Sequence, residues 1–296
     1  MKTYHIPVLI EELVEFISPA PGMIIVDATI GGGGHAKAML ERMANKGLLI
    51  GIDQDPDAIS YCQHLKESFG EMVVLFQERF SRLDRVLDKL GIDKVDAIYF
   101  DLGVSWHQLE EAERGFSFMR NGPLDMRMNP SEGEPAYSIL SKLNVRELEQ
   151  IFREYGEERY SHRVAKAIVE LRRQGRRLKR TRELAELVER VVPRRGQRVH
   201  PATRIFQALR IYVNQELDEL KKGLEKAYSR LKRGGRIAVI SYHSLEDRIV
   251  KNSFREWAKG SGFKILTKKP IQPKQEEIKA NPKARSAKLR CGEKIR

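Results

Sequence analysis

The 296-residue chain contains only two cysteines, Cys62 and Cys291. Two cysteines cannot build a disulfide framework, and their spacing matches no metal site, so we expect no bound metal. The sequence also shows no apolar signal peptide and no apolar run long enough to cross a membrane. We therefore expect a soluble cytoplasmic protein whose length allows one large domain, or two smaller ones, with a substantial core.

Acidic residues are in deficit. The chain has 54 Lys and Arg against 41 Asp and Glu, a formal net charge of +13. Residues 159–198 contain fourteen basic and four acidic residues, and residues 264–296 contain eleven and three. Single cations are ordinary on a solvated helix face, but two concentrated blocks favour a polyanionic partner, and nucleic acid is the expected one.

Glycine, by contrast, is concentrated at one point. An apolar run over residues 23–28, rich in β-branched side chains, contains Asp27 near its end, and four consecutive glycines follow at 31–34 before a helical pattern begins. Glycines at a strand-to-helix turn permit positive φ and close approach of the backbone to a ligand. The following helix presents its N–H groups and the positive end of its dipole to that ligand.

These glycines fit a nucleotide-binding fingerprint. Gly31, Gly33 and Ala36 have the G-x-G-x-x-A spacing, and Asp53 lies about 20 residues further on, where the fingerprint places its ribose-binding acid. The plain alternative is a tight turn without a ligand. Two cofactors suit the turn: a nicotinamide dinucleotide through its pyrophosphate, or S-adenosylmethionine through its methionine carboxylate.

Strand and helix patterns alternate from this turn onward. Strands are predicted at 23–28, 48–52, 72–76 and 95–100, with helices at about 35–45, 56–69 and 81–90 between them. This alternation predicts a parallel sheet with helices on both faces. Ligands of such sheets bind beyond the carboxyl ends of the strands, where this chain places Asp27, Asp53, residues 77–80 and Asp101.

The alternation stops after Ser105. Residues 107–134 are polar and rich in turns, yet they contain Phe116, Phe118, Met126 and Met128. These apolar residues either anchor a loop to the core or form a surface that contacts the substrate.

Residues 135–213 have helical patterns only. Asn144 and Glu147 form a capping-box pattern, and Thr181 is a plausible N-cap for a helix over 182–192. We interpret this region, which carries the first basic block, as an all-helical domain inserted into the sheet.

The α/β pattern then resumes. A helix over 216–231 leads to a fifth buried strand at 236–241, and two closing strands are expected at 263–267 and 287–291, antiparallel to each other or to the sheet. The proline-bearing link between these two strands is expected to be a mobile loop. This order favours a class I methyltransferase sheet over a dinucleotide-binding one, and the basic blocks favour a nucleic-acid methyl acceptor.

Six longer motifs, in this order, closely resemble the bacterial 16S rRNA cytosine-N4 methyltransferases, the MraW-like family. They are Gly33-Gly34-His35, Asp101-Leu102-Gly103-Val104-Ser105, Glu113-Arg114-Gly115-Phe116-Ser117-Phe118, Gly122-Pro123-Leu124-Asp125-Met126-Arg127-Met128, His200-Pro201-Ala202-Thr203-Arg204, and Ser241-Tyr242-His243-Ser244-Leu245-Glu246-Asp247-Arg248. The resemblance begins at Tyr4-His5 and extends to residues 281–286, so it covers nearly the whole chain.

The resemblance implies a class I S-adenosylmethionine-dependent methyltransferase fold: a Rossmann-like, seven-stranded, mostly parallel sheet with an inserted all-helical domain. We place the methyltransferase domain at residues 1–114 and 214–296, and the substrate-binding insertion at 115–213. The family further implies S-adenosylmethionine as cofactor and, as acceptor, a decoding-region cytidine of 16S rRNA within the small ribosomal subunit.

The same resemblance implies the cofactor contacts. These are Gly32, Gly33, Gly34 and His35 at the turn, Asp53 at the ribose, Phe80 against the adenine, and Asp101 with Gln108 near the methionine end. The chain departs from the usual family pattern at Ser105-Trp106-His107-Gln108, where relatives have Ser-Ser-Pro-Gln.

Two residues are candidates for catalysis. The exocyclic amine of cytosine is conjugated with its ring, so an acceptor that pulls on its N–H would localise the lone pair for attack on the methyl group. Asp101 either supplies that acceptor or binds the amino group of the cofactor. His243 either removes a proton or recognises the base, or it only organises its loop through Glu246 or Asp247. The Asp/Asn-Pro-Pro-aromatic motif of many amino-methyltransferases is absent.

Methylation at cytosine C5 is disfavoured, because that route usually needs a cysteine nucleophile in the site. Cys62 falls within a predicted helix, and Cys291 lies in the last predicted strand, away from the strand ends that carry Asp27, Asp53 and Asp101. The target base must leave its stack to reach the methyl donor. We expect the arginines of the insertion to bind phosphates; they are Arg172, Arg173, Arg176, Arg177, Arg194 and Arg195. Two other functions remain alternatives for the whole chain: a non-catalytic RNA-binding assembly factor on a methyltransferase scaffold, and an NAD-dependent oxidoreductase.

Overall fold

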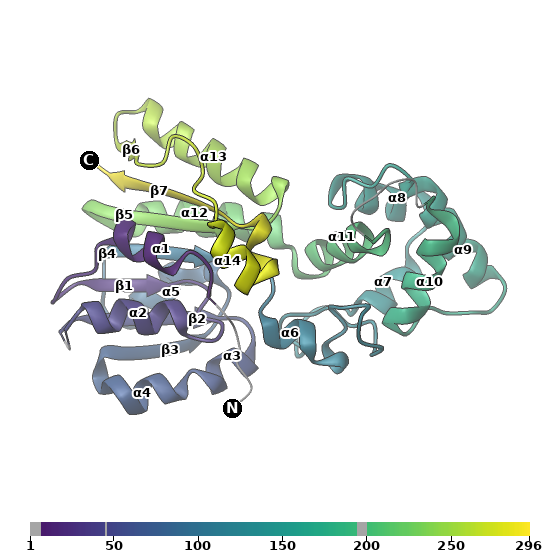
Figure 1. Ribbon diagram of the computed structural model, residues 1–296, viewed down its shortest axis with the longest axis horizontal. Helices are drawn as coiled ribbons and strands as arrows, with labels where there is room; N and C mark the ends of the chain where they lie inside the picture. The colour runs from purple at the N-terminus through teal and green to yellow at the C-terminus, as the bar shows by residue number, and fades with distance from the viewer. Residues whose placement is uncertain (1–6, 45, 194–199) are drawn as a thin grey trace. The chain divides into compact units, whose positions relative to one another are not determined.

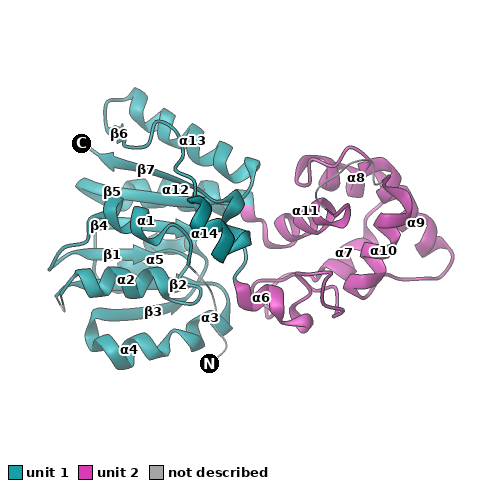
Figure 2. Cartoon of the chain, viewed as in Figure 1, with its two compact units in different colours: residues 1–105, 217–296 teal, residues 106–216 magenta. Residues whose placement is uncertain are grey.

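The computed structural model describes residues 7–44, 46–193 and 200–296. The chain divides into two compact units, coloured separately in Figure 2. The first consists of residues 1–105 and 217–296, and the second of residues 106–216.

The first unit is built on a seven-stranded sheet with the order β3-β2-β1-β4-β5-β7-β6 (Figure 1). Its strands are β1 (Ile24–Asp27), β2 (Leu48–Asp53), β3 (Val73–Gln77), β4 (Val95–Asp101), β5 (Leu231–Ser241), β6 (Phe263–Ile265) and β7 (Lys288–Lys294). The strands β1 to β5 pair in parallel, whereas β7 is antiparallel to both β5 and β6. The predicted fold class is therefore confirmed, including the antiparallel closing strands.

Helices cover both faces of this sheet, as expected for apolar strands buried on two sides. They are α1 (Ile10–Ile17), α2 (Gly34–Arg42), α3 (Pro56–Tyr61), α4 (Gln63–Phe69), α5 (Leu83–Lys89), α12 (Glu216–Arg230), α13 (Ser244–Lys259) and α14 (Gln275–Ala280). Alternate strand residues point to opposite faces, so Ile25 and Tyr99 join the apolar cluster under α1 and α2, while Val26 and Phe100 join the one under α5 and α12.

The strand order reverses beside β1, which pairs with β2 on one side and with β4 on the other. In open α/β sheets this reversal is where ligands bind, beyond the carboxyl ends of the strands. Asp27 ends β1 and Asp101 ends β4, so both acids lie at the reversal.

The second unit is helical. Its helices are α6 (Trp106–Glu110), α7 (Ala136–Lys142), α8 (Val145–Glu154), α9 (Ser161–Arg173), α10 (Thr181–Val191) and α11 (Ala202–Asn214). The described part of this unit contains no strand element, only an isolated bridge between Pro123 and Arg180. The capping box at Asn144 and Glu147 is present as predicted. No helix in the described ranges is long and apolar enough to cross a membrane.

The second unit begins nine residues before the predicted boundary and ends three residues after it. Its first residues belong to it because Arg114 donates hydrogen bonds to the carbonyl oxygens of Arg127 (3.3 Å) and Met128 (2.8 Å). Its last residues belong to it because the Arg210 guanidinium binds both carboxylate oxygens of Glu216, at 2.8 and 2.9 Å.

Three local predictions need correction. The helix predicted over 56–69 is two helices that meet at Cys62, whose Sγ approaches the carbonyl oxygen of Gly31 at 3.3 Å. Thr181 is the first residue of α10 and Arg180 is its N-cap. The link expected to be a mobile loop contains α14 and a 3-10 helix at Pro282–Ser286, because Asn281 caps that helix and a proline at the first helical position favours it.

Candidate active site

The turn between β1 and α2 has a backbone that favours glycine. Gly31 and Gly33 have φ angles of +49° and +73°. At Gly33 a Cβ atom would lie 2.8 Å from Leu65 Cδ1, and at Gly34 it would lie 2.8 Å from Pro7 Cγ. α2 begins at Gly34, so its first N–H groups and the positive end of its dipole belong to this turn. The turn therefore suits an anionic group at a helix N-terminus.

Asp53 joins the end of β2 to the glycine turn. Its Oδ2 accepts a hydrogen bond from the Gly31 N–H at 3.0 Å, and its Oδ1 accepts one from the Asp55 N–H at 2.9 Å. The two bonds fix the orientation of the carboxylate at the strand end. This is the position that the fingerprint assigns to the ribose-binding acid.

Asp27 is buried beneath the turn, and only 1% of the residue is exposed to solvent. The Tyr99 hydroxyl donates to its Oδ2 at 2.8 Å, and the Thr29 N–H donates to its Oδ1 at 3.1 Å. Burial raises the pKa of Asp27 to about 7, against the effect of these two hydrogen bonds, and the charges of Asp101 and Asp53 raise it further. Asp27 therefore ties β1 to β4 rather than contacting solvent.

Asp101 contacts Tyr242, His35 and Thr29. The Tyr242 hydroxyl donates to its Oδ1 at 2.9 Å, and Nδ1 of His35 lies 3.5 Å from its Oδ2. Its backbone N–H donates to the Thr29 hydroxyl oxygen at 2.6 Å. The structure thus brings together the predicted residues His35 and Asp101, at the strand reversal and beside the glycine turn.

Tyr242 was not singled out from the sequence. It directly follows Ser241, the last residue of β5, and β5 pairs with β4 next to Asp101. Burial and the neighbouring Asp101 carboxylate raise the pKa of the Tyr242 hydroxyl well above its usual value, so the group stays a hydrogen-bond donor. A strand-end position on a strand adjacent to β4 is the signal that identifies it.

His243 is the N-cap of α13. Its Nδ1 accepts a hydrogen bond from the Glu246 N–H at 3.4 Å, while Glu246 Oε2 accepts bonds from the N–H groups of Tyr242 and His243, at 2.8 and 3.3 Å. Its Nε2 lies 3.2 Å from Glu246 Oε1 without hydrogen-bond geometry. Among the alternatives for His243, these contacts favour organisation of the loop through Glu246. Asp247 instead pairs with Arg290 at 2.7 Å.

Phe80 and Gln108 are two further predicted cofactor residues. Phe80 begins a 3-10 helix after β3, and its ring packs edge-on against Phe100 with centroids 5.5 Å apart. A Cβ at Gly223 of α12 would lie 2.6 Å from the Phe80 ring, so this ring fills space in the core. Gln108 is buried on α6 in the second unit. The contacts of both residues with a cofactor stay predictions, as does that of Gly32 in the turn.

Neither cysteine is suited to nucleophilic attack. Cys62 lies beneath the glycine turn, and Cys291 lies in β7. Burial raises the pKa of both thiols, and the carboxylates of Asp27 and Asp53 raise that of Cys62 further. Because the thiolate is the reactive form, these surroundings agree with the expectation that C5 chemistry is disfavoured.

In the second unit, most apolar residues of the 107–134 segment serve as anchors. Phe116, Met126 and Met128 are buried, and the Phe118 ring stacks on His200 with centroids 4.5 Å apart. Met119 is 79% exposed. The interpretation as a loop pinned by apolar anchors therefore accounts for most of the segment. His5 lies outside the described residues.

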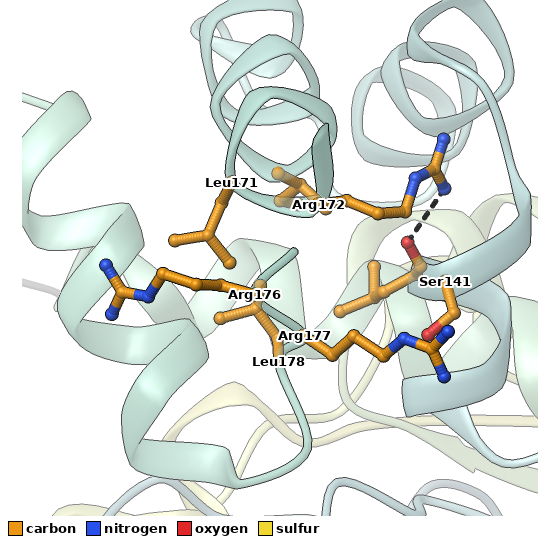
Figure 3. A pocket seen from close by; sticks show the side chains of 8 residues that line it. Ser141, Leu171, Arg172, Arg176, Arg177 and Leu178 are labelled. Atoms are coloured by element: carbon orange, nitrogen blue, oxygen red, sulfur yellow. Dashed lines mark hydrogen bonds between the residues drawn. The ribbon is translucent and has the colours of Figure 1, made fainter. Parts of the chain in front are cut away.

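The arginines of the first basic block differ in their surroundings. Arg172 donates hydrogen bonds to the carbonyl oxygens of Leu140 (3.2 Å) and Leu143 (2.9 Å), at the end of α7. Arg173, Arg176 and Arg177 are exposed. Arg176 and Arg177 line one small pocket with Arg172 and Ser141, and their side chains extend in opposite directions (Figure 3). Arg194 and Arg195 lie outside the described residues.

Comparison with known proteins places this arrangement in a family. The model of the MraW methylase family matches residues 2–295. The chain belongs to this family. It is 46% identical to "Ribosomal RNA small subunit methyltransferase H" of Geobacter sulfurreducens over 312 residues, covering 100% of both chains. It is 45% identical to the protein of the same name from Heliobacterium modesticaldum, again over 100% of both chains.

A solved structure described as a putative rRNA-methylase from Clostridium thermocellum is 15% identical to the chain, with a TM-score of 0.48. It covers 98% of this chain and 99% of the other.

Proposed function

We propose that this chain is an S-adenosylmethionine-dependent methyltransferase that methylates the N4 amine of a cytidine in the decoding region of 16S rRNA. Membership of the MraW methylase family supports methyl transfer over hydride transfer and over a purely structural role, and full-length relatives carry a ribosomal RNA methyltransferase name. The observation that carries the proposal is the Asp101 carboxylate, fixed by His35 and Tyr242 beside the glycine turn.

The residues of the turn fit this cofactor. A Cβ at Gly33 or Gly34 would collide with Leu65 or Pro7, so the turn requires glycine at these positions. α2 begins at Gly34, and the N–H groups of its first turn can bind the methionine carboxylate. Asp53 stands at the end of β2 for the ribose hydroxyls. When bound, S-adenosylmethionine supplies a methyl group on a positively charged sulfur. We propose that Gly32, Gly33, Gly34, His35, Asp53, Phe80, Asp101 and Gln108 form its site.

Asp101 then acts on a hydrogen-bond donor. Its carboxylate accepts a hydrogen bond either from the N4 amine of cytosine, which localises the nitrogen lone pair, or from the amino group of the cofactor, which orients the methyl donor. Either role accelerates methyl transfer, because it orients one of the two reactants and because the carboxylate acceptor is already positioned before the reaction. His243 acts indirectly, since its contacts hold the turn that carries Tyr242.

The reaction is tested by mass spectrometry of nucleosides. Small ribosomal subunits from a host lacking the modification are treated with the enzyme and isotope-labelled S-adenosylmethionine. We expect label in N4-methylcytidine or its 2′-O-methyl form, and a rate reduced by about 10²-fold or more for Asp101→Asn. Label in another nucleoside would falsify the acceptor assignment. Free 16S rRNA treated in parallel distinguishes naked RNA from the small subunit, the substrate that we propose for a cytoplasmic enzyme.

We further propose that the second unit binds RNA phosphates through Arg173, Arg176 and Arg177, and through Arg194 and Arg195. Arg172 is left out of the test because its guanidinium is hydrogen-bonded to the carbonyl oxygens of Leu140 and Leu143, at the end of α7. Removing one arginine–phosphate interaction reduces the slope of log affinity against log salt by about 0.7 to 0.9. Replacing Arg173, Arg176 and Arg177 by alanine should therefore reduce the slope by about 2 to 3.

A matched control removes the same charge elsewhere. Lys37, Lys66 and Lys259 are exposed cations of the first unit, and their triple alanine variant has the same net charge as the arginine variant. The two variants are compared by filter binding of small subunits over a range of salt concentrations. Equal slopes for both variants would refute a phosphate site on the second unit.

A further inference from the structure

A chain of contacts runs through the carboxylate at the end of β4. Nε2 of His35 lies 2.9 Å from the carbonyl oxygen of Val8, and Nδ1 of the same ring lies 3.5 Å from Asp101 Oδ2. On the other side of the carboxylate, Oδ1 accepts the Tyr242 hydroxyl hydrogen at 2.9 Å. One histidine therefore connects a backbone carbonyl to an acid at the proposed site.

The contacts with Val8 and Asp101 indicate where the protons of His35 lie. A carbonyl oxygen can only accept a hydrogen bond, so Nε2 must carry a proton toward Val8. A neutral ring with that proton would present the bare lone pair of Nδ1 to a carboxylate oxygen, which is repulsive. A second proton on Nδ1 turns this repulsion into an ion pair.

The surroundings favour the charged ring. His35 is 6% exposed. Burial by itself penalises the charged ring, but it also leaves little water to screen the attraction between the ring and the Asp101 carboxylate. Titratable groups near it in the described part of the chain include Asp101 and Tyr99 of β4, and the Tyr99 ring lies edge-on with its centroid 6.3 Å away. Tyr242 lies beyond Asp101, and Glu277 of α14 accepts a hydrogen bond from the Leu9 N–H, next to Val8. Asp27 lies behind Tyr99, bonded to its hydroxyl. An imidazolium here offsets the negative charge of the buried Asp101 carboxylate.

We propose that His35 is a resident imidazolium that positions Asp101 as an ionised carboxylate, with Tyr242 setting its other oxygen. His35 is then a positioning residue whose side chain need not touch the cofactor. Asp101, neutralised by this cation, serves as a hydrogen-bond acceptor, and the proton that the methylated amine loses passes to solvent water. The inference rests on the proposed function only for its kinetic readout.

The protein alone provides the first test. In a sample with ¹⁵N-labelled histidine, the His35 signals are assigned by their loss in His35→Gln. Nitrogen shifts at neutral pH should show both ring nitrogens of His35 protonated, and Tyr242→Phe should leave that state in place. A bare Nδ1 in the wild-type protein would overturn the proposal, and no RNA or methylation is needed for this result.

Two substitutions separate the two contacts. The amide of His35→Gln can replace Nε2 and keep the bond to Val8, but it has no charge for Asp101. The amide of His35→Asn can replace Nδ1 and reach Asp101, but it cannot reach Val8. If the cation matters, His35→Gln should lower kcat about tenfold to hundredfold, the loss expected for a hydrogen bond to a charged group, with little change in KM for RNA.

The pH profile completes the test. Wild-type kcat should fall on the alkaline side as the imidazolium loses its proton, and this limb should be absent in His35→Gln, which is slow at every pH. A His35→Gln enzyme with wild-type kcat and the wild-type alkaline limb would overturn the proposal. If instead no nucleoside is methylated by any form, the proposed function fails, while the nitrogen shifts still decide the charge of His35.

Discussion

The buried Asp27 carboxyl group should make the stability of the protein depend on pH. The side chain is 1% exposed and its pKa is raised from 3.8 to about 7, first of all by burial. The substitution Asp27→Asn keeps the size of the side chain and removes its titration. The comparison of the two proteins over pH therefore isolates one carboxyl group.

The number of protons bound to the folded and unfolded chains determines whether the unfolding free energy rises or falls with pH. Between pH 4 and 7 the folded protein holds a proton on Asp27 that the unfolded chain has released, so rising pH favours unfolding. The destabilisation is absent below about pH 4 and complete above about pH 7. A shift of about three pKa units corresponds to about 4 kcal/mol of unfolding free energy between these limits.

Urea unfolding of both proteins at pH 4, 5, 6, 7 and 8 measures the effect, with secondary-structure circular dichroism as the signal. The asparagine loses an acceptor for Tyr99 or Thr29, so Asp27→Asn should be the less stable protein at pH 4. Its deficit should shrink by about 4 kcal/mol by pH 8, and this shrinkage is the predicted quantity. Parallel pH dependences for the two proteins would show that Asp27 does not titrate in this range, and would refute the reasoning.

Three more substitutions test other parts of the structure. Gly33→Ala should lower the affinity for S-adenosylmethionine at least tenfold in calorimetry, because its Cβ would lie 2.8 Å from Leu65 Cδ1 at a residue with positive φ. The control Gly91→Ala also has a positive φ, +67°, but open space around its Cβ, so it should lower the unfolding free energy by about 1 kcal/mol without loss of binding. Equal losses of binding in the two variants would contradict this prediction. Arg172→Ala should lower the unfolding free energy by about 1 to 3 kcal/mol because the carbonyl oxygens of Leu140 and Leu143, at the end of α7, lose their donor. An unchanged urea midpoint would argue against that role. Asn214→Ala should destabilise the second unit by about 2 to 4 kcal/mol, because the Asn214 side chain accepts a hydrogen bond from the Met128 N–H at 2.7 Å and donates one to the Met126 carbonyl oxygen at 2.8 Å. Amide hydrogen exchange that stays slow throughout residues 123–136 in the variant would contradict this prediction.

Local patterns in the sequence were sufficient to place the acids of the site. Strand ends follow from apolar runs, and the carboxyl ends of parallel strands share one edge of the sheet, so Asp27, Asp53 and Asp101 were expected near the glycine turn. The sequence did not predict how the surroundings of these acids differ. Asp27 is buried, whereas Asp53 accepts a hydrogen bond from the glycine turn, because the direction of each side chain depends on packing from other elements.

Contacts between distant segments could not be predicted in this way. Tyr242 reaches Asp101 because β5 lies next to β4, and no spacing rule reveals that adjacency across 141 residues. The Phe80 ring packs into the core because α12 has Gly223 opposite it. α14 was missed because its proline-bearing surroundings resemble a loop, although Glu277 accepts a hydrogen bond from the Leu9 N–H at 2.8 Å and so holds the start of α1.

The insertion between β4 and β5 also sets an order of events during synthesis. β4 is made before the whole second unit, yet its partner on one side is β5, which follows that unit. Until β5 is made, β4 is an unpaired edge strand with apolar side chains, the kind of edge that invites wrong pairing. Asp101, at the end of that edge, gains its Tyr242 partner only when β5 docks. The nascent chain can therefore form its glycine turn early, but its complete carboxylate site is among the last features to assemble.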